Sequence, residues 1–219
     1  MEATIRKAWL ALRFSRATYN HCDDFSTTGG AMDGKDDCNV LILAGLWNSG
    51  PQHWQILWEH KHPDWQRVPH RDWTNPTCEE WVAELDAAIA ASELGPPLLV
   101  AHSLACALVA QWAKSGSNLH VAGAVLVAPS DVDAPGYPRE AVGFAPMPME
   151  KLAFPSVVVA SSNDEYVSIG RARAFAGAWG SKLVEIGEAG HINGASGFGA
   201  WAEGEQLVLD FCAERKRTH

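Results

Sequence analysis

The sequence predicts a single α/β domain in which a mostly parallel central sheet is covered by helices on both faces. Short apolar runs recur from residue 39 onward, and several are apolar at every position, as in strands that are buried on both sides. Segments with helical spacing lie between these runs, and this alternation is typical of α/β domains. The chain has 219 residues, which is enough for one domain with a sizeable core and short for two.

The expected elements follow one another in a regular order. Strands are predicted at residues 39–45, 65–70, 97–102, 121–129, 156–161 and 182–187, with the weakest pattern at 65–70. Helices are predicted at 76–95, 103–116, 168–180 and 204–216. The first helix has clear boundary signals, because Thr77 and Glu80 form a capping box and Gly95 lies at its far end. Residues 1–37 have no sustained period, so we expect a poorly ordered extension before a domain of residues 38–219.

Composition and charge argue against several classes of partner. The formal net charge is −9, and the basic residues cluster only in the tail Arg215–Arg217, which argues against nucleic acids and anionic membranes. No stretch reaches the roughly 18 apolar residues of a membrane helix. The five cysteines have no regular spacing, which predicts reduced, mostly buried thiols and a cytoplasmic protein. The string "HKHPD" at His60–Asp64 is a weak metal pattern, so we expect neither a metal nor a cofactor.

A serine lies where a buried strand is predicted to turn directly into a helix. The string "AHSLA" places Ser103 at the apex of this turn, with the small residues Ala101 and Ala105 on either side. This is the design of a nucleophile elbow, usually written G-x-S-x-G, in which small residues let the strand and the helix approach closely. A serine at a helix N-terminus is also a common cap. The string alone therefore leaves two interpretations open, a nucleophile and a cap.

An acid and a histidine follow two later strands, so their side chains are expected at the same edge of the sheet. Asp164 follows the fifth predicted strand and His191 follows the last. The chain order serine, acid, histidine is that of the catalytic triad in α/β-hydrolases. In that chemistry, His191 would accept the proton of Ser103, and Asp164 would orient the imidazole. Asp131, one strand before Asp164, is the alternative acid.

Hydrogen-bond donors are needed for the negative charge of a tetrahedral intermediate. We expect one to be the backbone N–H of Leu104, at the start of the helix after the serine, and the second to come from Leu46 or Trp47, with Leu46 the candidate donor. Trp47 and Phe198 are the candidates for substrate binding. Residues 129–155 form a long proline-rich connection, which is either a substrate-facing excursion above the site or a solvated irregular loop.

Several strings of the chain resemble one known family in register. They include "AGLWNSGPQHWQILWE", "AHSLACALVAQWA", "FPSVVVASSNDEYVS" and "ARAFAGAWGSKLVEIGEAGHINGASGFGAW", and the resemblance covers nearly everything from Val40 to Gly204. The family is the small serine hydrolases grouped as retinoblastoma-binding protein nine and YdeN, within the α/β-hydrolase superfamily. The resemblance implies a compact α/β-hydrolase fold with little or no lid domain. It puts the nucleophile on Ser103, the acid on Asp164 and the base on His191. The family usually has glycine where this chain has alanine two residues after the serine.

The residues and the resemblance together predict a serine hydrolase that cleaves a carboxylic ester or related acyl bond of a small molecule, through an acyl-enzyme on Ser103. The alternative is a protein-interaction module on a hydrolase scaffold with little turnover. The sequence keeps all three candidate residues, which favours the enzyme, and it does not indicate a protein partner.

Overall fold

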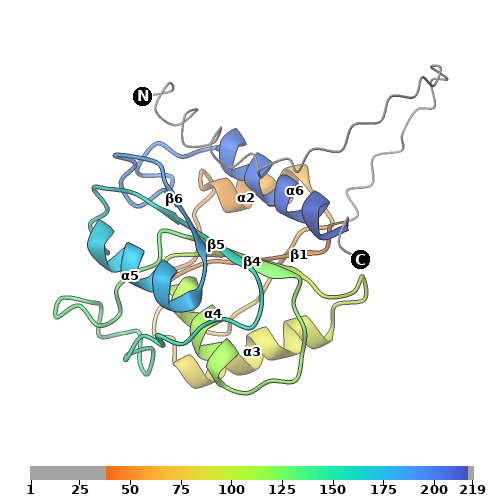
Figure 1. Cartoon of the computed structure of the whole chain (residues 1–219), viewed down its shortest axis with the longest axis horizontal. Helices are drawn as coiled ribbons and strands as arrows, with labels where there is room; N and C mark the ends of the chain where they lie inside the picture. The colour runs from red at the N-terminus through yellow and green to blue at the C-terminus, as the bar shows by residue number, and fades with distance from the viewer. Residues whose placement is uncertain (1–37, 217–219) are drawn as a thin grey trace, which may run out of the picture.

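A central sheet of six strands organises the chain. We describe residues 38–216 of a computed structural model, so the extension expected at 1–37 lies outside the described residues. Figure 1 shows the sheet with its helices. The strands are β1 (Val40–Leu43), β2 (Gln66–Arg67), β3 (Leu98–His102), β4 (Gly123–Val127), β5 (Ser156–Ala160) and β6 (Lys182–Glu185). Their order is β2-β1-β3-β4-β5-β6, and every neighbouring pair is parallel.

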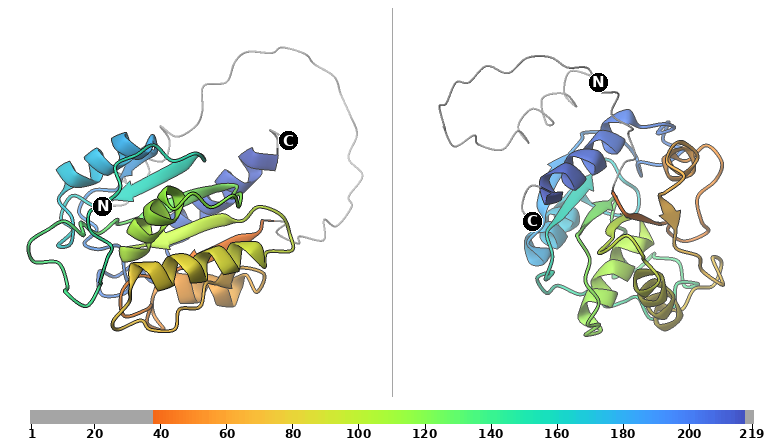
Figure 2. Two further views of the ribbon diagram at one scale, coloured as in Figure 1. Left: turned by 90° about the horizontal axis from the view of Figure 1, so that it is seen from below. Right: turned by 90° about the vertical axis from the view of Figure 1, so that its right-hand side faces the viewer.

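Helices cover both faces of this sheet, as the two views of Figure 2 show. They are α2 (Trp54–Lys61), α3 (Cys78–Ala90), α4 (Leu104–Lys114), α5 (Ile169–Trp179) and α6 (Ala202–Lys216). Alternate strand residues point to opposite faces. Ile42 and Val100 belong to the core that packs on α2 and α6, whereas Leu41 and Leu99 belong to the core beneath α3, α4 and α5. The predicted α/β fold, mostly parallel and helix-covered on both sides, is therefore confirmed.

Most of the expected elements have a counterpart in the structure. Helix α3 begins with the predicted cap, since Thr77 Oγ1 accepts the N–H of Glu80 at 3.3 Å. The weakest predicted strand is also the shortest, because β2 spans only two residues. Helix α2 has no counterpart among the expected helices. Its 8 residues make too few turns for a helical period to stand out in the sequence.

The long connection between β4 and β5 forms no regular helix or strand, but it is tied to the domain. Arg171 on α5 donates to Asp131 at 2.7 Å and to Asp133 at 2.9 Å. Further along, Val142 pairs with Thr77 in an isolated parallel bridge just before α3. These contacts fix the position of the connection relative to the sheet.

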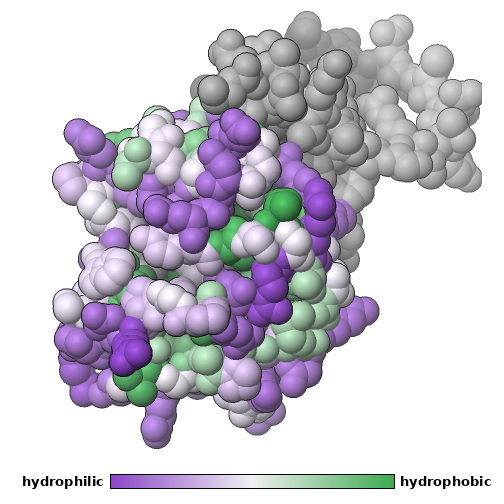
Figure 3. All heavy atoms as spheres, turned by 90° about the vertical axis from the view of Figure 1, so that its left-hand side faces the viewer, coloured by the Kyte–Doolittle hydropathy of each residue, from purple (hydrophilic) through white to green (hydrophobic). Residues whose placement is uncertain are grey.

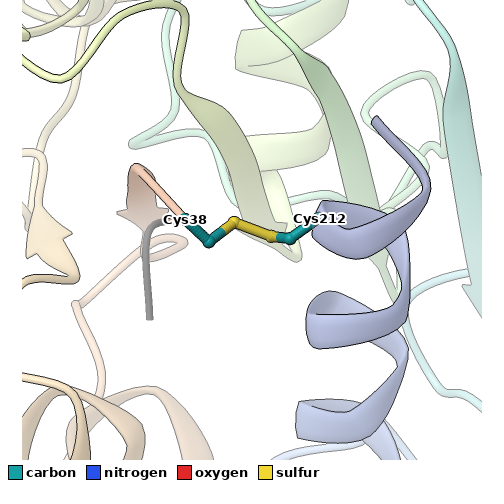
Figure 4. The surroundings of a disulfide bond; sticks show 2 residues. All are labelled: Cys38 and Cys212. Atoms are coloured by element: carbon teal, nitrogen blue, oxygen red, sulfur yellow. A yellow bond between two sulfur atoms is a disulfide. The ribbon is translucent and has the colours of Figure 1, made fainter. Parts of the chain in front are cut away.

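A disulfide joins the beginning of the sheet to the last helix, as Figure 4 shows. Cys38 precedes β1, Cys212 lies on α6, and their Cα atoms are 5.8 Å apart although 174 residues separate them in sequence. The expectation of reduced thiols is therefore wrong for this pair. Their proximity is created by the packing of α6 against the sheet, which residue spacing does not report. Cys78 and Cys106 are free thiols, as expected.

The surface seen from the left-hand side of Figure 1 is mostly hydrophilic. Figure 3 shows that hydrophobic side chains occur on this face in small separate groups. Among the helices of residues 38–216, none has both the length and the apolar character that crossing a membrane requires.

Candidate active site

The turn from β3 into α4 holds Ser103 in an unusual backbone conformation. Its φ is 60° and its ψ is −124°, a region that residues other than glycine rarely adopt. The backbone N–H of Ser103 donates to the carbonyl of Val127 at 3.0 Å, which ties the turn to β4. The hydroxyl makes no capping bond to α4. Of the two interpretations open from the sequence, the cap is therefore not the one that the structure adopts.

Close backbone approach explains the small residues around this turn. Ala101 and Ala105 are fully buried on either side of the serine. Gly45, two residues after the end of β1, packs directly on the turn. A Cβ atom at position 45 would lie 2.8 Å from Ser103 Cβ and 3.0 Å from the carbonyl oxygen of His102. Sequence reasoning missed this residue, and its only signal is its position at the end of a predicted strand.

We therefore expect Gly45→Ala to displace the turn. The added methyl group meets backbone atoms that cannot rotate away, and overpacking of this kind costs about 2 kcal/mol of folding free energy. Urea denaturation measures that loss, and the rate of labelling by a serine-directed probe measures the displacement. Gly50→Ala in the same loop is the control, because a Cβ there meets nothing within 4 Å. Equal behaviour of the two variants would contradict this account.

Three side chains from three strand ends meet at the carboxyl edge of the sheet. Ser103 Oγ lies 2.9 Å from His191 Nε2, and His191 Nδ1 lies 2.9 Å from Asp164 Oδ2. An ionised carboxylate only accepts hydrogen bonds, so Nδ1 carries the hydrogen of a neutral imidazole and Nε2 accepts from the serine hydroxyl. The side chain of Asp164 is fully buried and that of His191 is 6 % exposed, so bulk water does not weaken their interaction.

Further hydrogen bonds hold the acid and the histidine in place. The backbone N–H of Tyr166 donates to Asp164 Oδ1 at 2.8 Å, and the N–H of His191 donates to Ser196 Oγ at 3.1 Å. His102, next to the serine, donates from Nε2 to the carbonyl oxygen of His191 at 2.9 Å. This contact gives His102 a structural role rather than that of a second base.

The alternative acid, Asp131, is engaged elsewhere. Both of its carboxylate oxygens accept bonds from the guanidinium of Arg171, at 2.7 and 2.8 Å. This ion pair helps to raise the pKa of Arg171 further, through the hydrogen bond and the charge of the carboxylate. The geometry therefore favours Asp164 over Asp131 as the partner of His191.

A cavity of about 190 Å³ lies over the serine. Its lining includes Leu46, Trp47, Tyr137 and Tyr166, so the long connection after β4 contributes to its wall. The backbone N–H of Trp47 donates to the carbonyl of Trp73 at 2.8 Å, which leaves Leu46 as the donor of the expected pair. Trp47 is 55 % exposed, so its side chain is available to a ligand.

Two residues singled out in the sequence lie away from this cavity. Phe198 is not among the described residues that line it, and its ring packs edge-on against Trp201, with the ring centroids 5.8 Å apart. His62 from the "HKHPD" string stacks on Trp65 and bonds to Glu205 at 2.5 Å. In the described part of the chain, no group of three histidine, cysteine, aspartate or glutamate side chains is arranged to hold a metal ion.

Two histidines beside the serine remain neutral because they are buried. Burial, with the positive charge of Arg67 and the neighbouring His191, lowers the pKa of His53 to about 3. Burial and the same neighbouring histidine lower the pKa of His102 well below its ordinary value. His53 Nδ1 accepts the backbone N–H of Gln55 at 3.2 Å and so caps α2. The neutral rings form part of the low-dielectric wall behind the serine.

These neutral histidines predict acid sensitivity of the fold. Below pH 6.5 the unfolded chain protonates His53, whereas the folded protein does not until pH approaches 3, so stability falls as pH falls. At pH 5, His53 alone is expected to remove about 2 kcal/mol of folding free energy. Urea denaturation at pH 7 and pH 5 measures this loss. His53→Asn, which keeps a capping side chain, should reduce it, whereas the exposed control His60→Asn should not.

Fold and site together define a class of protein. A parallel sheet in this strand order, with a serine at the turn from β3 into α4, is that of an α/β hydrolase. The chain belongs to the serine hydrolase family, whose model matches residues 40–210. The resemblance inferred from the sequence is thereby confirmed.

Solved structures support the same assignment. A YdeN-like hydrolase from Pectobacterium atrosepticum is 31% identical, with 82% of this chain and 94% of that chain covered and a TM-score of 0.72. The ydeN gene product of Bacillus subtilis, 19% identical, covers 80% of this chain and 98% of its own with a TM-score of 0.65. Esterase 2 of Thermogutta terrifontis is 20% identical and shares the fold, with 83% of this chain and 84% of that chain covered and a TM-score of 0.56. No curated protein gives a significant match.

Proposed function

We propose that this serine hydrolase cleaves a carboxylic ester or a related acyl bond through an acyl-enzyme on Ser103. The observation that supports the proposal is the continuous chain of short contacts from Ser103 Oγ to His191 Nε2 and from His191 Nδ1 to Asp164. A serine hydroxyl is a weak nucleophile at neutral pH, and a hydrogen-bonded imidazole oriented by a carboxylate is the arrangement that activates it.

The proposed reaction has two half-reactions. Ser103 Oγ attacks the carbonyl carbon while its proton passes to His191 Nε2, and Asp164 stabilises the imidazolium that forms. The tetrahedral intermediate collapses, the bond to the leaving oxygen breaks, and that oxygen receives the proton from His191. Water then attacks the acyl-enzyme, giving its proton to His191, and the acid product leaves as Ser103 Oγ recovers a proton.

The oxyanion would be bound by backbone N–H groups. Leu104 is the first residue of α4, so its N–H lies at the positive end of the helix dipole. Leu46 lines the cavity from the loop after β1. Loss of one such donor typically costs about 3 kcal/mol of transition-state stabilisation. We propose small acyl compounds as substrates, bound against Trp47, because the cavity measures only about 190 Å³.

Covalent labelling tests the proposal. Intact mass after treatment with a fluorophosphonate probe is expected to show one adduct on the wild type and none on Ser103→Ala. Ser162→Ala, at an exposed serine in the loop after β5, is the control and should label like the wild type. A folded wild type without an adduct would contradict the proposal and would favour the protein-interaction module instead.

The cellular location is a separate prediction. The sequence favoured the cytoplasm because its cysteines have no disulfide-like spacing, whereas the Cys38–Cys212 bond supports an oxidising compartment. The redox state of this pair in cells decides between the two. Alkylation of thiols during lysis, followed by mass spectrometry, measures it directly.

A further inference from the structure

The oxygen of Ser103 has a second hydrogen-bond partner besides His191. Ser130, in the connection after β4, is 1 % exposed, and its Oγ lies 2.8 Å from Ser103 Oγ. Both serines line the cavity over the site. The two half-reactions described above give Ser130 no role. Ser130 directly follows the strand predicted at residues 121–129, but nothing in the sequence shows which hydroxyl it contacts.

A count of hydrogens fixes the direction of this contact. The hydroxyl of Ser103 has one hydrogen, and that hydrogen must point at His191 Nε2 if the imidazole is to accept it. The contact between the two serines therefore uses the hydrogen of Ser130. Ser130 is the donor, and Ser103 Oγ accepts through a lone pair.

Tyr137 lines the same cavity as Ser130. Burial, the largest influence, raises the pKa of its hydroxyl, so the hydroxyl stays protonated. Ser130 commits its only hydrogen to Ser103, so the series of hydrogen bonds runs from Ser130 to Ser103 to His191.

We propose that Ser130 is a catalytic residue whose hydroxyl stabilises negative charge on Ser103 Oγ, chiefly when that oxygen leaves the acyl carbon in deacylation. The inference depends on the acyl-enzyme of the proposed function. During acylation the donor both stabilises charge on Oγ and withdraws electron density from the nucleophile, so the two effects oppose each other. During deacylation Oγ is a leaving group, and the donor only helps.

The deacylation step balances without any further group. Water adds to the acyl carbon and gives its proton to His191 Nε2. When the bond from carbon to Ser103 Oγ breaks, the electron pair stays on Oγ. The hydrogen of Ser130 bonds to that oxygen until the proton on His191 returns to it. Ser130 keeps its own hydrogen throughout.

Stopped-flow hydrolysis of p-nitrophenyl acetate separates the two steps, since the burst reports acylation and the steady state reports deacylation. We expect Ser130→Ala to slow deacylation about tenfold and acylation less than threefold, with acetyl-enzyme accumulating in the intact-mass spectrum. Ser130→Thr, which keeps a hydroxyl, should restore deacylation.

Ser156→Ala is the matched control. Ser156 is 5 % exposed and shares a serine–serine hydrogen bond of 2.6 Å with Ser181, but it lies on β5 at a distance from the nucleophile. Its loss should leave the ratio of acylation to deacylation unchanged. Equal slowing of both steps in Ser130→Ala would overturn the inference and leave the proposed function intact. A wild type that forms no acetyl-enzyme would overturn both.

Discussion

Replacing Asp164 by asparagine is expected to lower kcat/KM for an ester about 10⁴-fold while the protein remains folded. The carboxylate accepts the Nδ1 hydrogen of His191 at 2.9 Å. An amide nitrogen facing Nδ1 would favour the other tautomer, in which Nε2 carries the hydrogen and cannot accept the proton of Ser103. The measurement is steady-state hydrolysis of a chromogenic ester, with thermal unfolding to show that the fold persists.

Asp131→Asn is the matched control for this result. It removes the same charge from a neighbouring strand end, but its partner is Arg171 rather than His191. We expect a lower melting temperature from the weakened ion pair and less than about a threefold change in kcat/KM, since no reacting group loses a contact. If Asp131→Asn lost activity and Asp164→Asn did not, Asp131 would be the acid.

Removal of the disulfide should cause the largest loss of stability. The bond between Cys38 and Cys212 closes a loop with a sequence separation of 174, and loop-closure entropy grows with that separation. We expect the double variant Cys38→Ala/Cys212→Ala to lose about 4 kcal/mol of unfolding free energy, and roughly 10 °C in Tm. Urea denaturation of the wild type and the variant measures the difference.

Reduction of the wild type supplies an independent check. With dithiothreitol its urea midpoint should fall to that of the double variant, and the variant itself should not respond. Cys78→Ala is the control, because burial raises the pKa of that thiol to about 11 and keeps it out of thiol exchange. A wild-type midpoint that is unchanged on full reduction would contradict the prediction.

The fold was predictable because its signals are local and repeated. Strands such as Leu98–His102 and Gly123–Val127 are buried at every position, so their apolar runs identify them without any neighbour. Helix α3 carries its own start signal in Thr77. Helix α2 lacked such a signal, because its buried residues Trp54 and Trp58 span one turn and their burial is decided by Trp201 and the rest of the core.

The candidate site was also predictable only where its signals are local. Ser103, Asp164 and His191 each follow a strand, so topology alone predicted that they would meet. Contacts between distant segments carry no periodic signal. The packing of Gly45 on the elbow and the hydroxyl contact of Ser130 therefore emerged only from the folded chain. For the same reason the sequence could not place Phe198, whose ring turns toward the core.

The bridge between Cys38 and Cys212 also determines how the protein would carry a mechanical load. Force applied to the two ends of the oxidised chain passes through the covalent bond and bypasses every strand and helix between the two cysteines. Stretching should then extend only the segments outside the bridge, and the active-site geometry would be retained under tension. After reduction the same pull would act on β1, between β2 and β3 in the sheet, and on α6 across its face, so the domain itself would unfold under load.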